Sequence, residues 1–308
     1  MARLEFESID ELKRYLRSTS DLTGAAFQSL DFTGMEPVLT GVILRDNLLL
    51  GCTVPPDALA LFEAPLIFPP LPGLPFNPFR GTLYSPEELL GGYTIGDPTS
   101  FEKTVDGGTY RQYMEEGKEE TMDVRTTLAR RLHDHAISDA LQEYLVGKKV
   151  VAIMGGHNMG RDNPMYLEVA RLARELVHEG FLPASGGGPG AMEATHLGAW
   201  FAERPDEELI DAVTMLAKAP KYVPQDAWLD AAFEVRAKYP ITSRSRCDSL
   251  GVPTWLYGHE PPTCFALHIA KYFANSVREE GLLAIARYGV VFSPGNAGTI
   301  QEVFQDVT

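Results

Sequence analysis

The stretch "KKVVAIMGGHNMGRDNPMYLEVARLARELVHEGFLPAS", residues 148–185, decides the fold class. It begins with a short run of apolar residues that ends in two glycines, a pattern typical of a buried strand. Apolar residues then recur at helical spacing from Pro164 to the glycine at 180, and a second short strand is predicted over 181–185. A strand, a helix and a strand in this order indicate a βαβ unit with parallel strands.

The same alternation continues along the rest of the chain. A helical pattern over 122–147 comes before the first strand, and another helix is predicted to begin near Ala191. After it we predict a strand over 252–258, a helix over 265–286, a strand over 288–293 and a final helix. Such alternation favours an α/β fold, a doubly wound parallel sheet of the Rossmann-like type with helices on both faces. We assign this domain to residues 122–308.

Residues 1–121 have a different composition, and we predict an N-terminal accessory α+β region there. Prolines crowd residues 55–86 and interrupt both helices and central strands. The preceding stretch "VLTGVILRDNLLLGCTV", residues 38–54, predicts two strands joined at residues 45–47. No internal repeat is apparent, and we expect no chemical site in this region.

Charge and cysteine usage restrict the class of partner. The formal net charge is −15, which argues against nucleic acid as a partner because no basic stripe is available for its phosphates. The three cysteines form no CxxC pair, so neither a disulfide framework nor a zinc site is expected, and free thiols fit a reducing compartment. The N-terminus lacks the apolar core of a signal peptide, and no stretch is long enough to span a bilayer. We expect a cytoplasmic protein without a membrane partner.

Three glycine-rich loops follow predicted strands, where ligands bind to parallel sheets. The first, "MGGHNMGRDNP" at 154–164, offers Gly155, Gly156 and His157. Its glycines do not have the GxGxxG spacing, and the next strand carries no acidic residue that could bind a ribose. We therefore expect no nicotinamide cofactor.

The second loop, "SGGGPGAMEATHLGA" at 185–199, has four glycines within five residues. A tight turn needs only one or two, so close contact between the backbone and a ligand is favoured. The residues expected to contact this ligand are Gly186, Gly187, Gly188, Gly190, Met192 and Glu193.

The third loop lies in "FSPGNAGTIQEVFQD", residues 292–306. Thr299 and Glu302 match a capping box, which by itself needs no ligand. Alternatively, the loop is a phosphate cradle at a helix N-terminus, with Glu302 as an ionised carboxylate one turn into the helix. The two interpretations are compatible. The predicted cradle consists of Gly295, Asn296, Ala297, Gly298 and Thr299. Since no strand follows the last helix, we expect the natural protein to continue beyond Thr308.

The motifs "GGH", "GGGPGAMEA", "EPP" (260–262) and "PGNAGTIQE" occur in the order found in the LOG-like nucleotide 5′-monophosphate nucleosidases, which are often labelled lysine decarboxylases. Residues 148–308 resemble this family, and most of all its bacterial pyrimidine/purine nucleotide 5′-monophosphate nucleosidases. The resemblance implies hydrolysis of the N-glycosidic bond of nucleoside 5′-monophosphates to free base and ribose 5-phosphate. It implies Glu302 and Arg278 as the catalytic pair, with Arg287 as the alternative arginine. It also implies a homo-oligomer, a dimer or larger, that needs no metal and no cofactor.

Departures from the family pattern keep a second function open. The family's Pro-Gly-Gly is Pro294-Gly295-Asn296 here, and the spacing from Arg278 to this motif differs by about one residue. The alternative is a non-catalytic nucleotide sensor on the same fold. A lysine decarboxylase is disfavoured, because Lys148 and Lys149 precede a strand and so lie at the wrong end of the sheet. The segment 204–258, with Arg244 and Arg246, is either a specificity lid or part of an ordinary surface.

Overall fold

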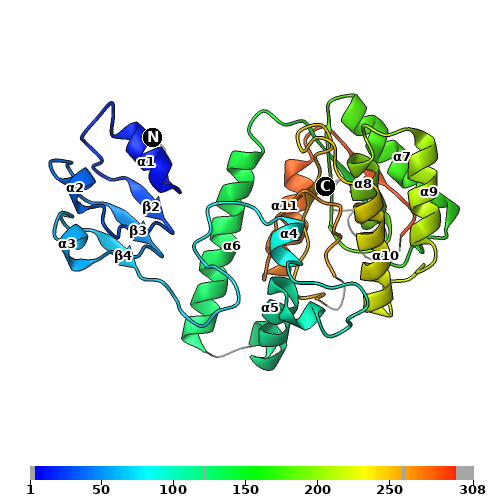
Figure 1. The fold of residues 1–308 in the computed structure, drawn as a ribbon, viewed down its shortest axis with the longest axis horizontal. Coiled ribbons are helices and arrows are strands. Elements are labelled where there is room, and N and C mark those ends of the chain that lie inside the picture. Colours follow the sequence, from blue (N-terminus) through cyan, green and yellow to red (C-terminus); the bar gives the residue numbers. More distant parts are fainter. Residues whose placement is uncertain (1–3, 121–122, 259–260, 296–308) are drawn as a thin grey trace. The chain divides into compact units, whose positions relative to one another are not determined.

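The chain forms two compact units in a computed structural model that describes residues 4–120, 123–258 and 261–295 (Figure 1). The first unit comprises residues 1–82 and 123–140, and the second comprises 83–122 and 141–308. This division differs from a single boundary after residue 121. Residues 83–122 belong to the second unit, where the carboxylate of Asp106 forms an ion pair with Lys271, both fully buried.

The second unit is built on a parallel sheet of five short strands with the order β8-β7-β6-β5-β9. The strands are β5 (Val150–Met154), β6 (Leu182–Ser185), β7 (Leu250–Gly251), β8 (His268–Ile269) and β9 (Val290–Phe292). Every pairing is parallel, with Ala152 opposite Ala184 on one side and opposite Val290 on the other. The predicted doubly wound α/β fold is confirmed.

Helices connect these strands. They are α7 (Pro164–His178), α8 (Ala191–Trp200), α9 (Asp206–Leu216), α10 (Gln225–Lys238) and α11 (Asn275–Ile285). Helices α7 and α8 pack against each other and against β6. The chain reverses its direction across the sheet after β8, so a right-handed crossover puts α11 on the face opposite α7 and α8.

Two predicted elements near the carboxyl end of the chain are wrong. Residues 252–258 contain no strand beyond an isolated bridge at Thr254, because the strand lies just before them, in β7. The helix predicted over 265–286 begins only at Asn275, and β8 occupies part of the preceding segment. Residues 264–267 are fully buried, and such a short apolar run does not distinguish a strand from a helix.

Residues 83–120 cover one edge of this sheet. Tyr84 forms an antiparallel bridge with Ile269, so the outer side of β8 is paired. The segment then forms four short helices: α4 (Pro86–Leu89), η1 (Phe101–Lys103), α5 (Val105–Glu115) and η2 (Lys118–Glu120). Pairing protects an edge strand from association with other chains.

The first unit contains a second parallel sheet, with strands in sequential order (Figure 1). The strands are β1 (Glu5–Phe6), β2 (Ala26–Gln28), β3 (Leu48–Leu50) and β4 (Leu66–Phe68), and the helices α1 (Ile9–Tyr15), α2 (Glu36–Leu39) and α3 (Pro56–Leu59) lie between them. Ala26, Leu48 and Leu66 stand opposite one another in consecutive strands. Further parallel bridges join Asp21 to Ile43 and Asp31 to Thr53. The chain therefore winds in stacked coils, as in a β-solenoid.

The corners of these coils repeat as well. Gly24, Asp46 and Ala64 each lie two residues before paired strand positions, and all three have left-handed backbone conformations. The next corner repeats the same conformation at Ser29 and Gly51. The expectation of no internal repeat is therefore wrong. A short motif was visible in the sequence: "DLTG" at 21–24 and "DFTG" at 31–34 form the same turn, in which Asp21 and Asp31 accept hydrogen bonds from Thr23 and Thr33.

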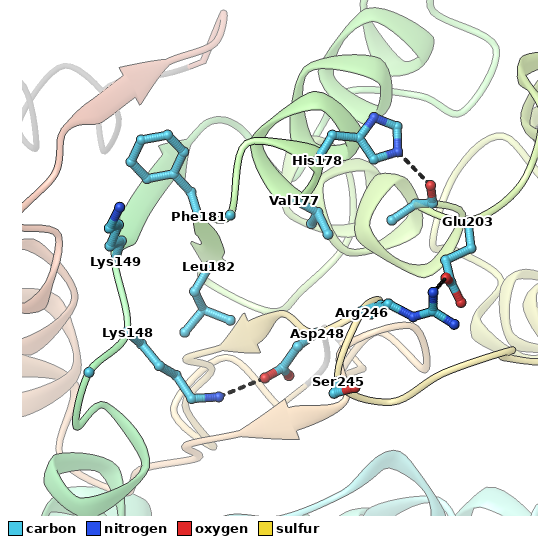
Figure 2. A pocket seen from close by; sticks show the side chains of 13 residues that line it. Lys148, Lys149, Val177, His178, Phe181, Leu182, Glu203, Ser245, Arg246 and Asp248 are labelled. Atoms are coloured by element: carbon cyan, nitrogen blue, oxygen red, sulfur yellow. Dashed lines mark hydrogen bonds and ion pairs between the residues drawn. The ribbon is translucent and has the colours of Figure 1, made fainter.

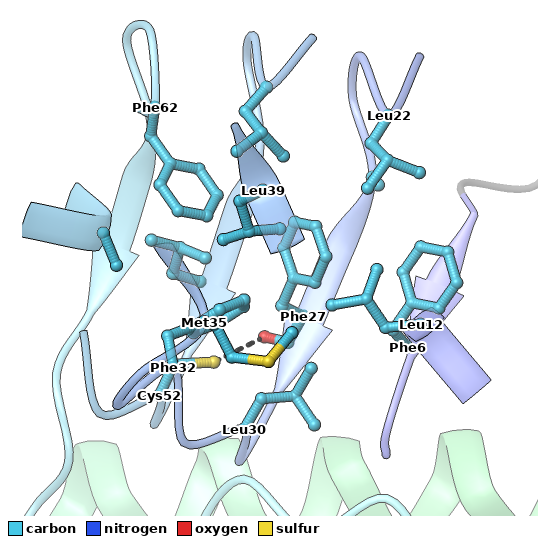
Figure 3. Close-up of a cluster of buried hydrophobic side chains, with 14 residues drawn as sticks. Phe6, Leu12, Leu22, Phe27, Leu30, Phe32, Met35, Leu39, Cys52 and Phe62 are labelled. Carbon is cyan, nitrogen blue, oxygen red and sulfur yellow. Dashed lines mark hydrogen bonds between the residues drawn. The ribbon is translucent and has the colours of Figure 1, made fainter. Parts of the chain in front are cut away.

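Aromatic and aliphatic side chains fill the coils (Figure 3). Phe6 and Phe27, paired in neighbouring strands, stack with ring centroids 5.6 Å apart. Phe27 also contacts Phe32 and Phe62 edge to face.

Of the two strands predicted within 38–54, the structure contains only β3, because residues 42–44 lead into a corner of the coil. Helix α6 (Val124–Tyr144) was predicted correctly, and none of the helices in the described part of the chain is long and apolar enough to cross a bilayer.

Candidate functional site at the carboxyl edge of the sheet

The strand order creates a switch point between β5 and β9. From β5 the chain moves outward through β6, β7 and β8, and it then returns to the other side of β5 as β9. The loops that leave β5 and β9 therefore diverge, and ligands of open α/β sheets bind in the crevice between such loops. The first and third glycine-rich loops begin here.

The first loop, the start of α8 and the end of β9 lie in contact at Gly155. A Cβ atom at this position would be 2.6 Å from the Cβ of Ala191 and 3.1 Å from the Cβ of Ser293. Ser293 also donates its backbone N–H to the carbonyl of Met154 at 2.8 Å, which extends the pairing of β9 with β5. Glycine at 155 lets the three segments approach each other at the carboxyl edge.

The second loop packs equally closely on the first. Gly190 has a φ of +74°, and a Cβ there would be 2.9 Å from the carbonyl oxygen of His157. The backbone N–H of Ala191 donates to the carbonyl of Gly156 at 3.3 Å. Gly187 has a φ of +73° and accepts a hydrogen bond from Thr263 at 2.8 Å, and Gly188 is buried beside it. Loop packing thus accounts for part of the glycine content of this motif.

Arg278 reaches the second loop from the first turn of α11. Its Nη1 atom lies 4.0 Å from the position that a Cβ would take at Gly186, and Met192 Sδ lies 2.5 Å from the same position. Arg278 Nε is buried and has no hydrogen-bond partner among the described residues. Arg287, in contrast, is exposed and precedes β9, at the amino edge of the sheet. Of the two candidate arginines, Arg278 is the one at the carboxyl edge.

The third loop is described only up to Gly295. The predicted cradle residues Asn296, Ala297, Gly298 and Thr299, and the predicted catalytic Glu302, lie outside the described residues. Their roles remain predictions.

Glu193 has a different role from the predicted contact with a ligand. Its carboxylate is fully buried and accepts hydrogen bonds from Arg161 Nε at 2.7 Å and Nη2 at 2.5 Å. The hydroxyl of Tyr166 donates to the same carboxylate at 2.8 Å, and burial raises the pKa of Tyr166 well above its ordinary value, which keeps this donor protonated. Glu193 therefore connects α8 to the first loop through Arg161 and to α7 through Tyr166.

Arg161, which the sequence analysis did not single out, extends this anchor to a further segment. Its Nη1 atom donates to the carbonyl oxygens of Ala219 at 3.3 Å and Trp228 at 3.0 Å, and its guanidinium lies 4.5 Å from the centre of the Trp228 ring. Its backbone N–H donates to Pro220 at 2.9 Å. The only hint of this role in the sequence was that Arg161 is a charged residue within a glycine-rich loop, because its partners are far away in the sequence.

A cavity of 360 Å³ opens beside this anchor. His157 and Gly190 from the predicted site line it, together with Tyr222 and Trp228. The carboxyl edge thus combines closely packed glycine loops, the partly buried Arg278 and an adjacent cavity. In the described part of this edge, no three His, Cys, Asp or Glu side chains lie close enough together to share a metal ion.

A larger cavity of 610 Å³ lies at the opposite, amino edge of the sheet (Figure 2). Its charged side chains are largely paired: Lys148 with Asp248 at 2.8 Å, and Arg246 with Glu203 at 2.8 Å. Arg244 and Arg246 are both more than half exposed. Neither of them is part of a lid over the carboxyl edge, because they precede β7. Size alone therefore does not identify the site that the glycine loops form.

A scan against models of known protein families finds no match, and a search among curated proteins finds no significant one.

Proposed function

We propose that the chain hydrolyses the N-glycosidic bond of nucleoside 5′-monophosphates and releases the free base and ribose 5-phosphate. The observation that carries this proposal is the meeting of glycine-rich loops at the switch point of a parallel sheet, with Arg278 directed at one of them. The resemblance of residues 148–308 to LOG-like nucleosidases supports the same reaction.

The residue types suit the chemistry. Glycosidic cleavage passes through an oxocarbenium-like state, which a nearby carboxylate stabilises while it orients or deprotonates water. Glu302 takes this role in the proposal. Arg278 binds the phosphate or the ribose hydroxyls, since a guanidinium forms paired hydrogen bonds with such oxygens. Binding energy from the phosphate holds the ribose in place for attack.

The setting in the cell is part of the proposal. All three cysteines are free and buried, which fits a reducing compartment such as the cytoplasm. The resemblance also supports a homo-oligomer, a dimer or larger. Light scattering coupled to size-exclusion chromatography measures that state directly.

The first experiment is chromatography of free base released from AMP, GMP, IMP, CMP and UMP. We expect release by the wild type and a loss of at least about 100-fold in Glu302→Gln and Arg278→Ala, since each removes a group that acts in the transition state. Arg287→Ala is the matched control, because it removes an arginine from the other edge of the sheet, and it should retain wild-type activity.

A nucleotide sensor is the second candidate, favoured by Asn296 in place of the family's second glycine. Nucleotide binding by calorimetry with no base release from any of the five substrates would reject the hydrolase and support the sensor.

A further inference from the structure

One wall of the cavity beside the first glycine-rich loop consists of residues that have no role in the proposed reaction so far described. Residues 220–223, between α9 and α10, form this wall, and residues 157–161 of the first loop face it. Its 360 Å³ fall near the lower end of the range of about 300–1,000 Å³ typical of small-molecule sites.

Two flat rings line the cavity. The rings of His157 and Tyr222 meet edge to face, with centroids 6.0 Å apart and planes at 84°. In such a pair the edge of one ring packs on a face of the other, and aromatic rings of this kind also pack on planar groups. Both side chains are partly exposed, so a ligand from solvent can reach them.

Polar groups surround these rings. The exposed side chains of Asn158 and Lys221 line the same cavity. An amide offers both a donor and an acceptor, the combination that pairs with the edge of a nucleobase. Aromatic faces with an amide beside them are the usual means by which proteins bind an unstacked base.

The wall is fixed in position relative to the glycine loops. Arg161 binds the backbone of Ala219, Pro220 and Trp228, and its buried ion pair with Glu193 ties this segment to α8. Gly190, at the start of α8, lines the cavity and also contacts the first loop. The cavity therefore adjoins the edge at which the sugar and phosphate are proposed to bind, and the contacts of Arg161 hold its wall in that position.

We infer that this cavity is the base-binding subsite, in which the base packs on the Tyr222 and His157 rings and Asn158 reads its edge. This inference rests on the proposed function for the position of the ribose. Tyr222 supplies affinity for any planar base, and Asn158 discriminates between bases. Neither residue takes part in bond cleavage.

Calorimetry with two probes tests binding of the base and binding of the sugar phosphate separately. One probe is ribose 5-phosphate, which lacks a base, and the other is 2′-deoxy-2′-fluoro-AMP, whose fluorine slows cleavage by destabilising an oxocarbenium ion. We expect Tyr222→Ala to weaken binding of the fluorinated nucleotide by about tenfold or more and to leave ribose 5-phosphate within twofold. Tyr222→Phe keeps the ring and should bind both probes as the wild type does.

An equal loss for both probes in Tyr222→Ala, or no loss for either, would overturn the subsite, as would a wild type that binds neither probe. If Tyr222→Ala weakens binding of the fluorinated nucleotide alone, but the wild type releases no base from any substrate, the hydrolase would be rejected and the base-binding subsite would be supported. As a second readout, Asn158→Ala should change the ratio of the affinities for the fluorinated AMP and fluorinated IMP by about tenfold, because the 6-amino donor and N1 acceptor of adenine are replaced in hypoxanthine by a 6-oxo acceptor and an N1–H donor.

Discussion

The pair formed by Arg161 and Glu193 places two charges inside the protein, where both are at most 1% exposed. Removing charges from water is costly, and this arrangement offsets the cost with a guanidinium that meets both carboxylate oxygens and with a third donor, Tyr166. The same guanidinium also satisfies backbone carbonyls. The pair thus fixes several segments at once.

Glu193→Gln should lower the free energy of unfolding by about 3–5 kcal/mol, because it leaves the charge of Arg161 buried without its counter-charge. Urea denaturation followed by circular dichroism measures this change. The matched control is Arg171→Ala, which removes an arginine paired with Asp206 at a site where both side chains are about one-third exposed, and it should cost about 1 kcal/mol or less. Similar losses in the two variants would show that the buried pair is not a special anchor.

Single residues were the hardest part of the site to predict. The glycines stood out because four of them lie within five residues, and Arg278 was implied by the resemblance to LOG-like nucleosidases. The roles of Glu193, Arg161 and Tyr222 depend on partners that the fold brings together from far away in the sequence. A sequence pattern contains no distance of that kind, so a fully buried Glu193 could not be distinguished from a ligand contact.

Among the elements, the coils of the first unit depend most on their corners. Gly51 has a φ of +62°, and a Cβ at this position would be 2.8 Å from Cγ and 2.9 Å from Cβ of Phe79. Gly24 occupies an earlier corner with a φ of +73°, and no atom lies within 4 Å of its Cβ position. The two glycines share a backbone conformation and differ in the space around them.

Gly51→Ala should therefore destabilise the protein more than Gly24→Ala. The left-handed conformation costs an alanine about 1–2 kcal/mol at either corner, and crowding against Phe79 adds about 1–3 kcal/mol at Gly51 alone. Thermal unfolding by differential scanning calorimetry compares the two variants directly. If Gly24→Ala proved equally harmful, crowding by Phe79 would not be the cause.

The elements that the sequence predicted well are those with a long repeating pattern. Helices α6 and α7 span many turns, so their apolar periodicity was unambiguous. The strand β8 is only His268–Ile269 within a buried apolar segment, and no periodicity can be read from two residues. The coils were missed because their strands are two or three residues long and the sequence marks their corners with little more than the short motif at 21–24 and 31–34.

At the scale of the whole molecule, the five-stranded sheet has two chemically different edges. The carboxyl edge has close-packed glycine loops and Arg278, whereas the amino edge has the larger cavity and several paired charges. In parallel sheets the carboxyl edge binds ligands, since loops diverge and helix N-termini meet there. The proposed function therefore belongs to the edge with the smaller cavity.

The double variant Lys149→Ala and Arg246→Ala should keep its kcat/KM for nucleoside monophosphate hydrolysis within about twofold of the wild type. Both side chains line the amino-edge cavity, at the far end of the strands from the proposed chemistry. Initial rates of base release measure the effect, with Arg278→Ala in the same assay as the variant expected to fail. A large loss in the double variant would move the search for the active site to the amino edge.

The coils of the first unit have a consequence for how such a chain can change. Each strand pairs only with the coil before and the coil after it, and the same corner conformations return from coil to coil. In architectures of this kind, stability is a sum over neighbouring repeats. A gene duplication or deletion that spans one whole coil therefore keeps the same kind of contact between neighbouring coils, and the length of this unit can evolve in steps of a coil while the five-stranded unit keeps its sequence.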